Sequence, residues 1–179
     1  VVVMKSGELQ QVGTPFEGYS NPVNRFVARF IGSPPMNTLK GVIARESGRA
    51  WFVEAGEGGA KLRLSERASA SDQLTEGRAV QLGVRPQFFF EPGRGGRTAI
   101  PGETMRIVPR VVEPLGDLMD VHAEPAAGLP IVARIPAHAS LPTGAPVEMG
   151  VETDRVLVFD DDESGVNLAP LSAAQLASA

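Results

Sequence analysis

From Leu39 onward, the chain is a succession of short runs in which apolar and polar residues alternate, each bounded by Gly, Pro, Asp or Ser. Alternation with a period of two is the pattern of half-buried β-strands, and we count about nine such runs. No connection between them is long enough for the helical crossovers that a parallel sheet requires, so the spacing predicts an antiparallel barrel or sandwich. The runs are GVIAR, AWFVEA, AKLRL, AVQLGVR, MRIVPRVVE, MDVHAE, PIVARI, PVEMGVE and RVLVFD.

The first 36 residues follow different patterns. Residues 1–12 predict a β-hairpin that turns at Ser6-Gly7, and residues 14–17 carry a capping box that opens a short helix. Asn21-Pro22 is expected to start a second helix, which Gly32 ends at the C′ position. Its predicted apolar stripe follows the i, i+3, i+4, i+7 rule and consists of Val23, Phe26, Val27 and Phe30.

Charge and composition exclude several classes of function. The formal net charge is -4 and the pI is about 5.3, so the chain has no basic field for nucleic acid. Cysteine is absent, which removes disulfides and thiolate metal sites and fits a cytoplasmic protein. No apolar run approaches the roughly 20 residues of a membrane span. The run Phe88-Phe89-Phe90 is interpreted as core rather than as a base-stacking platform.

Motifs for catalysis and metal binding are missing. The sequence has no phosphate-binding G-x-x-x-x-G-K-[ST] loop and no G-x-S-x-G nucleophile, so we predict no catalytic residues. His122 has only Glu124 on the same strand face, and His138 has no partner at ligand spacing, so no metal site is predicted either. Residues 160–163 lack the order of a calcium loop and are expected to form a solvated acidic turn.

Charged and glycine residues mark several predicted strand ends. Arg85 before Pro86, Glu113 before Pro114 and the turn at Gly116 lie where β-barrels carry loops and ligand surfaces. Two interpretations stay open, exposed ion pairs with turns or a ligand surface, and the first is favoured. Residues 91–102 have the poorest core-forming composition and are the best candidate for a linker between two blocks of strands.

Four stretches together resemble one known family. Residues 1–37, VVVMKSGELQQVGTPFEGYSNPVNRFVARFIGSPPMN, are similar to the end of the nucleotide-binding domain in ATP-binding subunits of carbohydrate-type ABC importers. LGVRP at 82–86, VEPLG at 112–116 and VLVFD at 156–160 resemble motifs of the family's C-terminal TOBE domain. Gln87 stands where the family usually has Glu, and within the last motif a valine stands where histidine is common.

The resemblance implies a mostly β fold, an OB-fold-like (TOBE/MOP-like) double β-barrel preceded by a hairpin and one or two short helices. Residues 1–36 would be the remnant of the nucleotide-binding domain, 37–170 the regulatory domain and 171–179 a frayed tail. The family's ATPase motifs would precede Val1, so this chain is expected to be a non-enzymatic fragment without cofactors, whereas its full-length parent would bind ATP and Mg. The parent would lie at the cytoplasmic face of the cell membrane.

The resemblance also implies partners: a second copy of the chain, the ABC core, membrane permease subunits and a regulatory protein. An unpaired apolar edge at residues 1–4 independently favours self-association. The alternative is an OB-like module that binds a small ligand or an oxyanion; the transported substrate does not follow from the motifs. The structural or interface candidates carried by the family motifs are Asn21, Pro22, Phe26, Phe30, Gly32, Asn37, Arg85, Pro86, Glu113, Gly116 and Phe159.

Overall fold

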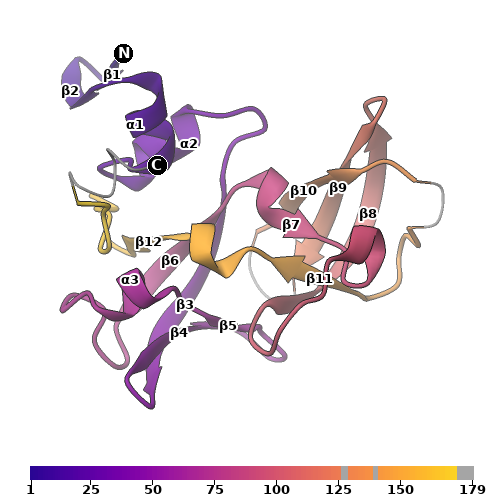
Figure 1. Cartoon of the computed structure of the whole chain (residues 1–179). Helices are drawn as coiled ribbons and strands as arrows, with labels where there is room; N and C mark the ends of the chain where they lie inside the picture. The colour runs from indigo at the N-terminus through magenta and orange to yellow at the C-terminus, as the bar shows by residue number, and fades with distance from the viewer. Residues whose placement is uncertain (126–128, 139–140, 173–179) are drawn as a thin grey trace.

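The computed structural model describes residues 1–125, 129–138 and 141–172, and in these residues it contains two five-stranded antiparallel sheets (Figure 1). The predicted mostly β, OB-fold-like class with short helices is confirmed, with a nearly closed five-stranded barrel and a further antiparallel sheet. In spatial order, the first sheet consists of β12 (Leu157–Asp160), β6 (Ala79–Val84), β3 (Asn37–Glu46), β4 (Arg49–Glu54) and β5 (Lys61–Arg63). The second consists of β10 (Ile131–Pro136), β9 (Leu118–Pro125), β8 (Thr104–Pro114), β11 (Val147–Val151) and β7 (Phe89–Phe90).

All nine predicted runs form strands, and their alternation places one face of each sheet in a shared core. In β4, for example, the even-numbered residues Ala50, Phe52 and Glu54 are buried while their neighbours are half-buried. The core continues through both sheets, from Leu39 and Ile43 of the first to Ile107 of the second. The aromatic run at 88–90 is buried, which confirms its interpretation as core.

The linker prediction for residues 91–102 is wrong in its placement. This mostly exposed segment, which includes the 3-10 turn η2 (Arg94–Gly96), joins β7 to β8, and both strands belong to the second sheet. The chain instead changes sheets at η1 (Pro86–Phe88) and returns at η3 (Thr153–Arg155). A two-residue strand such as β7 is too short to show alternation, so no sequence pattern marks the start of the second sheet before residue 91.

The N-terminal hairpin forms as predicted from β1 (Val2–Lys5) and β2 (Glu8–Val12). Both turn residues have positive φ, 50° at Ser6 and 86° at Gly7, as a two-residue type I′ turn requires. Helix α1 (Pro15–Ser20) follows with the predicted capping box: the Glu17 amide donates to Thr14 Oγ1 over 3.1 Å, and the Thr14 amide donates to Glu17 Oε2 over 2.6 Å.

The predicted start of the second helix at Asn21-Pro22 is wrong, because α2 (Arg25–Phe30) begins after Asn24. The Asn24 side chain accepts from the Val27 amide over 2.9 Å and is therefore the N-cap. Asn21 ends α1 instead. Gly32 follows the C-cap residue at the predicted C′ position, with φ 133°.

The predicted apolar stripe on α2 is only partly buried. Val27 and its neighbour Ala28 are fully buried, whereas Phe30 is 66% exposed and Val23 is also exposed. The remaining helix is α3 (Glu66–Ser69), so every helix of the described residues is short. None of the helices in the described ranges is long and apolar enough to cross a membrane.

Candidate functional site

Arg85, at the end of β6, holds both N-terminal helices against the first sheet. Its side chain lies in a largely buried position, with the residue only 3% exposed. Nη1 donates to the carbonyl oxygens of Ile31 and Ala28, over 2.7 and 3.3 Å, and Nη2 donates to the carbonyl oxygen of Tyr19. These carbonyls belong to the last turns of α1 and α2, which lack intrahelical partners and carry the negative end of the helix dipole. Arg85 therefore caps two helices at once.

The expectation that Arg85 forms an exposed ion pair or turn is wrong. The guanidinium contacts neutral carbonyls and lies 3.7 Å from the centre of the Tyr19 ring. Burial lowers the pKa of Arg85, and the nearby Tyr19 opposes that shift. Two other residues of the family motifs lie beside Arg85. Pro86 is buried at the start of η1, and Gly32 leaves room for the guanidinium, because a Cβ there would lie 3.1 Å from Arg85 Nη1.

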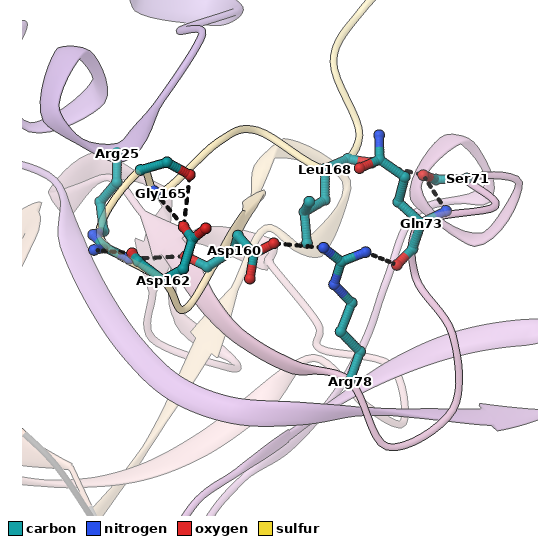
Figure 2. Close-up of polar contacts among 9 residues, drawn as sticks. Arg25, Ser71, Gln73, Arg78, Asp160, Asp162, Gly165 and Leu168 are labelled. Carbon is teal, nitrogen blue, oxygen red and sulfur yellow. Dashed lines mark hydrogen bonds and ion pairs between the residues drawn. The ribbon is translucent and has the colours of Figure 1, made fainter.

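A second connection runs from α2 to the turn after β12 (Figure 2). Arg25 donates from Nη1 to the Asp160 carbonyl over 2.9 Å and from Nη2 to the Asp162 carbonyl over 3.0 Å, and its amide donates to the Gly165 carbonyl over 2.8 Å. The Asp160 carboxylate pairs with Arg78, the residue directly before β6. The acidic turn after β12 thus forms as predicted, with Asp162 and Glu163 exposed, and its backbone and Asp160 are in addition bonded to two other elements.

The Asp162 carboxylate stabilises the shape of this turn. It accepts from Ser164 Oγ over 2.6 Å and from the Gly165 amide over 2.9 Å. These hydrogen bonds, the Ser164 side chain first, lower the pKa of Asp162. The parts of the chain that the structure describes contain no group of three or more His, Cys, Asp or Glu that could hold a metal ion.

The segment that follows this turn runs back to the N-terminal elements and contacts the chain around α1 and α2 (Figure 1). Asn167 Nδ2 donates to the Pro22 carbonyl over 3.0 Å. The Asn21 side chain makes two bonds with the Leu171 backbone, of 2.8 and 3.2 Å. On the other side of the segment, Ser71 Oγ donates to the Leu168 carbonyl over 2.6 Å (Figure 2). Leu171, placed in the predicted frayed tail, is held here, while residues 173–179 lie outside the described residues.

Asn37 links the two sheets. Its buried amide Nδ2 donates to the carbonyls of Val84 and Val132, over 3.0 and 2.8 Å, and its Oδ1 accepts from the Val132 amide over 2.8 Å. Phe159 is fully buried in a small cluster beneath α2 with Ala28, Met36 and Leu157. Sequence reasoning named Asn37 and Phe159 only through motif resemblance, because their partners are distant along the chain.

The structure does not bring all predicted candidates together. Glu113 and Gly116 lie in the β8–β9 hairpin, away from α1 and α2 (Figure 1). Glu113 Oε2 is 3.3 Å from His122 Nε2, and Gly116 has φ 88° in the turn. His138 Nε2 lies 2.5 Å from Glu91 Oε2, so each histidine has a carboxylate partner that sequence spacing did not reveal.

The N-terminal elements also present an apolar surface. Phe26 and Phe30 stack with ring centres 6.0 Å apart, and Lys5 lies 5.5 Å from the Phe26 ring centre. A depression of about 880 Å³ beside them is lined by both charged and apolar residues of the hairpin, α2 and the acidic turn. Exposed apolar side chains mark docking surfaces where they form a contiguous patch. Those on the hairpin, the helices and the segment between the helices are Val1, Val2, Met4, Leu9, Val12, Phe16, Val23 and Phe30.

We call the contacts of Arg85, Arg25, Asn21 and Asn167 with the N-terminal helices and the returning segment the junction; they connect the helices to the β region. Carbonyls, amides and guanidinium groups hold two helices, a returning segment and a sheet together, and the helices expose apolar side chains. A family model described as the MalK OB fold domain matches residues 32–89.

Residues 32–89 belong to the MalK OB-fold family.

Relatives of known family extend this similarity over most of the chain. The chain is 34% identical over 161 residues to the trehalose/maltose import ATP-binding protein MalK of Thermococcus litoralis, covering 89% of this chain and 42% of that protein. It is 33% identical over 168 residues to the sn-glycerol-3-phosphate import ATP-binding protein UgpC of Yersinia enterocolitica, covering 94% and 43%. The chain thus spans less than half the length of these relatives, and the match lies in their C-terminal OB-fold region without the ATPase domain. The predicted family resemblance is confirmed.

A solved structure supports the fold. The molybdate-bound form of the cytoplasmic molybdate-binding protein ModG aligns with a TM-score of 0.52 and 16% identity, covering 68% of this chain and 94% of that one. At this level of identity the likeness concerns the fold alone.

Proposed function

We propose that this chain is the regulatory and dimerising β region of the ATP-binding subunit of an ABC importer for a sugar or glycerol phosphate, and that it does not itself hydrolyse ATP. The observation that carries the proposal is the match of residues 32–89 to the MalK OB fold domain within a similarity that covers most of the chain. The names of the relatives supply the substrate class, trehalose/maltose or sn-glycerol-3-phosphate.

The junction supports a role in communication between domains. Arg85 and Arg25 bond α1 and α2 to the first sheet and to the acidic turn, so a displacement of the helices would be passed to the β region. In this proposal the exposed apolar side chains around Phe30 contact the ATPase core at the cytoplasmic face of the membrane. Permease subunits, a second copy of the chain and a regulatory protein complete the set of proposed partners.

A chimera tests the proposal. The C-terminal region of Thermococcus litoralis MalK that matches this chain would be replaced by the chain itself, and ATP hydrolysis and dimerisation of the chimera would be measured with its permease subunits. We expect transport-coupled hydrolysis in the chimera and none in the isolated chain. A chimera that folds and still fails to dimerise or to couple hydrolysis to transport would refute the proposed role.

Phe30→Asp in the chimera examines the apolar surface. A carboxylate placed in an interface is expected to weaken coupling by tenfold or more, because a buried unpaired charge costs several kcal/mol. Val111→Asp is the matched control, because Val111 is also exposed and lies on β8, outside the N-terminal elements. Equal effects of the two substitutions would count against this surface as the contact.

A further inference from the structure

A second depression, of about 350 Å³, lies between α1, η1 and η3. Ligand pockets in proteins begin at about this volume. Its lining combines three arginines and three aromatic rings with a single acidic side chain. The arginines are Arg67, Arg85 and Arg155, the rings belong to Phe16, Tyr19 and Phe88, and the acidic side chain is Asp154.

The charges in this lining are not balanced. Arg67 donates to the Ala169 carbonyl, and Arg85 donates only to carbonyls, so in the described residues neither forms an ion pair with a carboxylate. Burial lowers the pKa of both arginines, which reports the cost of holding a cation against neutral groups. Arg155 is 58% exposed, lies 3.7 Å from a Glu152 carboxylate oxygen and stacks 4.0 Å from the centre of the Phe88 ring.

Three arginines therefore face one aspartate, in a chain whose net charge is -4. A neighbouring depression of about 420 Å³ shares Arg67 and Asp154 and adds two more arginines, Arg49 and Arg63, with Glu66. The side chains that line the two depressions thus carry a net positive formal charge, of which Arg49, Arg63 and Arg155 are paired with Glu66, Glu103 and Glu152. A concave cationic site of this kind concentrates small anions, and planar guanidinium groups match the two oxygens of a carboxylate or phosphate.

We propose that the depression lined by Arg67, Arg85 and Arg155 binds a small organic oxyanion, a carboxylate or phosphate monoester with an apolar or ring-shaped body. Arg155 and Arg67 contact the oxyanion, and Arg85 contributes its charge from its position against the helix carbonyls. The exposed ring of Phe16 packs on the body of the ligand, beside the Tyr19 and Phe88 rings on which Arg85 and Arg155 stack. Asp154 opposes an anion, so its charge weakens the binding.

A ligand in this depression would touch several elements at once. Phe16 and Tyr19 belong to α1, Arg67 to α3 and Arg155 to η3, where the chain returns from the second sheet to the first. Occupancy would stabilise the junction that holds the helices on the β region. This inference goes beyond the proposed importer function and does not depend on it, because binding is a property of the chain alone.

Four small probes test the site on the purified chain at low salt, by thermal shift and calorimetry. We expect phenyl phosphate or benzoate to raise the melting temperature and the neutral benzyl alcohol not to, with inorganic phosphate weaker than phenyl phosphate because it has no body to pack. The ratio of phenyl phosphate to benzoate affinity distinguishes the two headgroups. Added salt weakens the binding. If none of the three anions binds at millimolar concentration, the proposal is wrong.

Two neighbouring substitutions should change affinity in opposite directions. Arg155→Gln removes a charged donor and is expected to weaken anion binding about tenfold or more. Asp154→Asn removes the opposing charge and is expected to strengthen it, an effect that general damage to the fold would not produce. Arg110→Gln is the control, because Arg110 pairs with Glu124 on the exposed side of the β8–β9 pair and lines no part of the depression. A loss of affinity in Arg110→Gln equal to that in Arg155→Gln, or weaker binding in Asp154→Asn, would overturn the assignment.

Discussion

Replacement of Arg85 by methionine tests whether a single side chain holds the helices on the β region. Methionine keeps the unbranched apolar stem of the side chain and can still pack on Tyr19, so the perturbation is mainly the loss of the guanidinium. Its three carbonyl partners, on Tyr19, Ala28 and Ile31, would lose their donor.

The magnitude follows from two opposing effects. A hydrogen bond from a charged donor contributes about 1.5–3 kcal/mol, so three of them set an upper bound of about 5–9 kcal/mol. Because the variant no longer buries a cation, the desolvation cost of the guanidinium is removed, which offsets several kcal/mol of this loss. We therefore expect Arg85→Met to lower the free energy of unfolding by about 3 kcal/mol, which moves the urea midpoint down by about 1.5 M for a typical slope of about 2 kcal/mol/M.

The assay is urea unfolding followed by the fluorescence of Trp51, the only tryptophan, on β4. Arg110→Met is the matched control, since Arg110 is exposed and should change stability by less than about 0.5 kcal/mol. Limited proteolysis between α2 and β3 gives a second readout, because helices without their cap detach more often. A loss below about 1 kcal/mol, or a loss equal to that of the control, would refute the capping role.

Three further predictions concern Asn37, Gly32 and Asp162. Asn37→Ala should destabilise the chain by about 2–4 kcal/mol in urea unfolding, because it leaves buried backbone groups of both sheets unpaired; a change below about 1 kcal/mol would contradict this. Gly32→Ala should lower the melting temperature more than Gly116→Ala does, since both glycines have positive φ but only a Cβ on Gly32 would meet other atoms. Equal decreases in melting temperature would show that the contact with Arg85 is unimportant. The pKa of Asp162 is lowered in the folded state, so its contribution to stability is present above the ordinary aspartate pKa of about 4 and is lost as pH falls through the folded value. Asp162→Asn should therefore reduce the loss of stability with falling pH in this range. A plot of unfolding free energy against pH that is unchanged on the acid side would disprove this.

Local signals account for what could be predicted in the N-terminal elements. The turn at Ser6-Gly7 and the capping box from Thr14 to Glu17 depend on residues at most three apart. The start of α2 differs from the prediction because both Asn21 and Asn24 are good N-cap residues; in the structure Asn24 caps α2, and the Asn21 side chain bonds to Leu171 instead. Leu171 lies 150 residues away in the sequence, beyond the reach of any local rule.

The sequence alone determined the strands, the hairpin and the family, because alternation, turn types and motifs depend on residues that are close together in the chain. Only the tertiary structure decided what the charged residues do. Arg85 lies 54 to 66 residues from the carbonyls that it caps, and Asn37 lies 95 residues from Val132 on the other sheet. Likewise, the pairing of β12 with β6 carries the acidic turn to Arg25 and places Arg155 beside Arg67. The burial of a guanidinium depends on which surfaces meet, and that is a property of the folded chain.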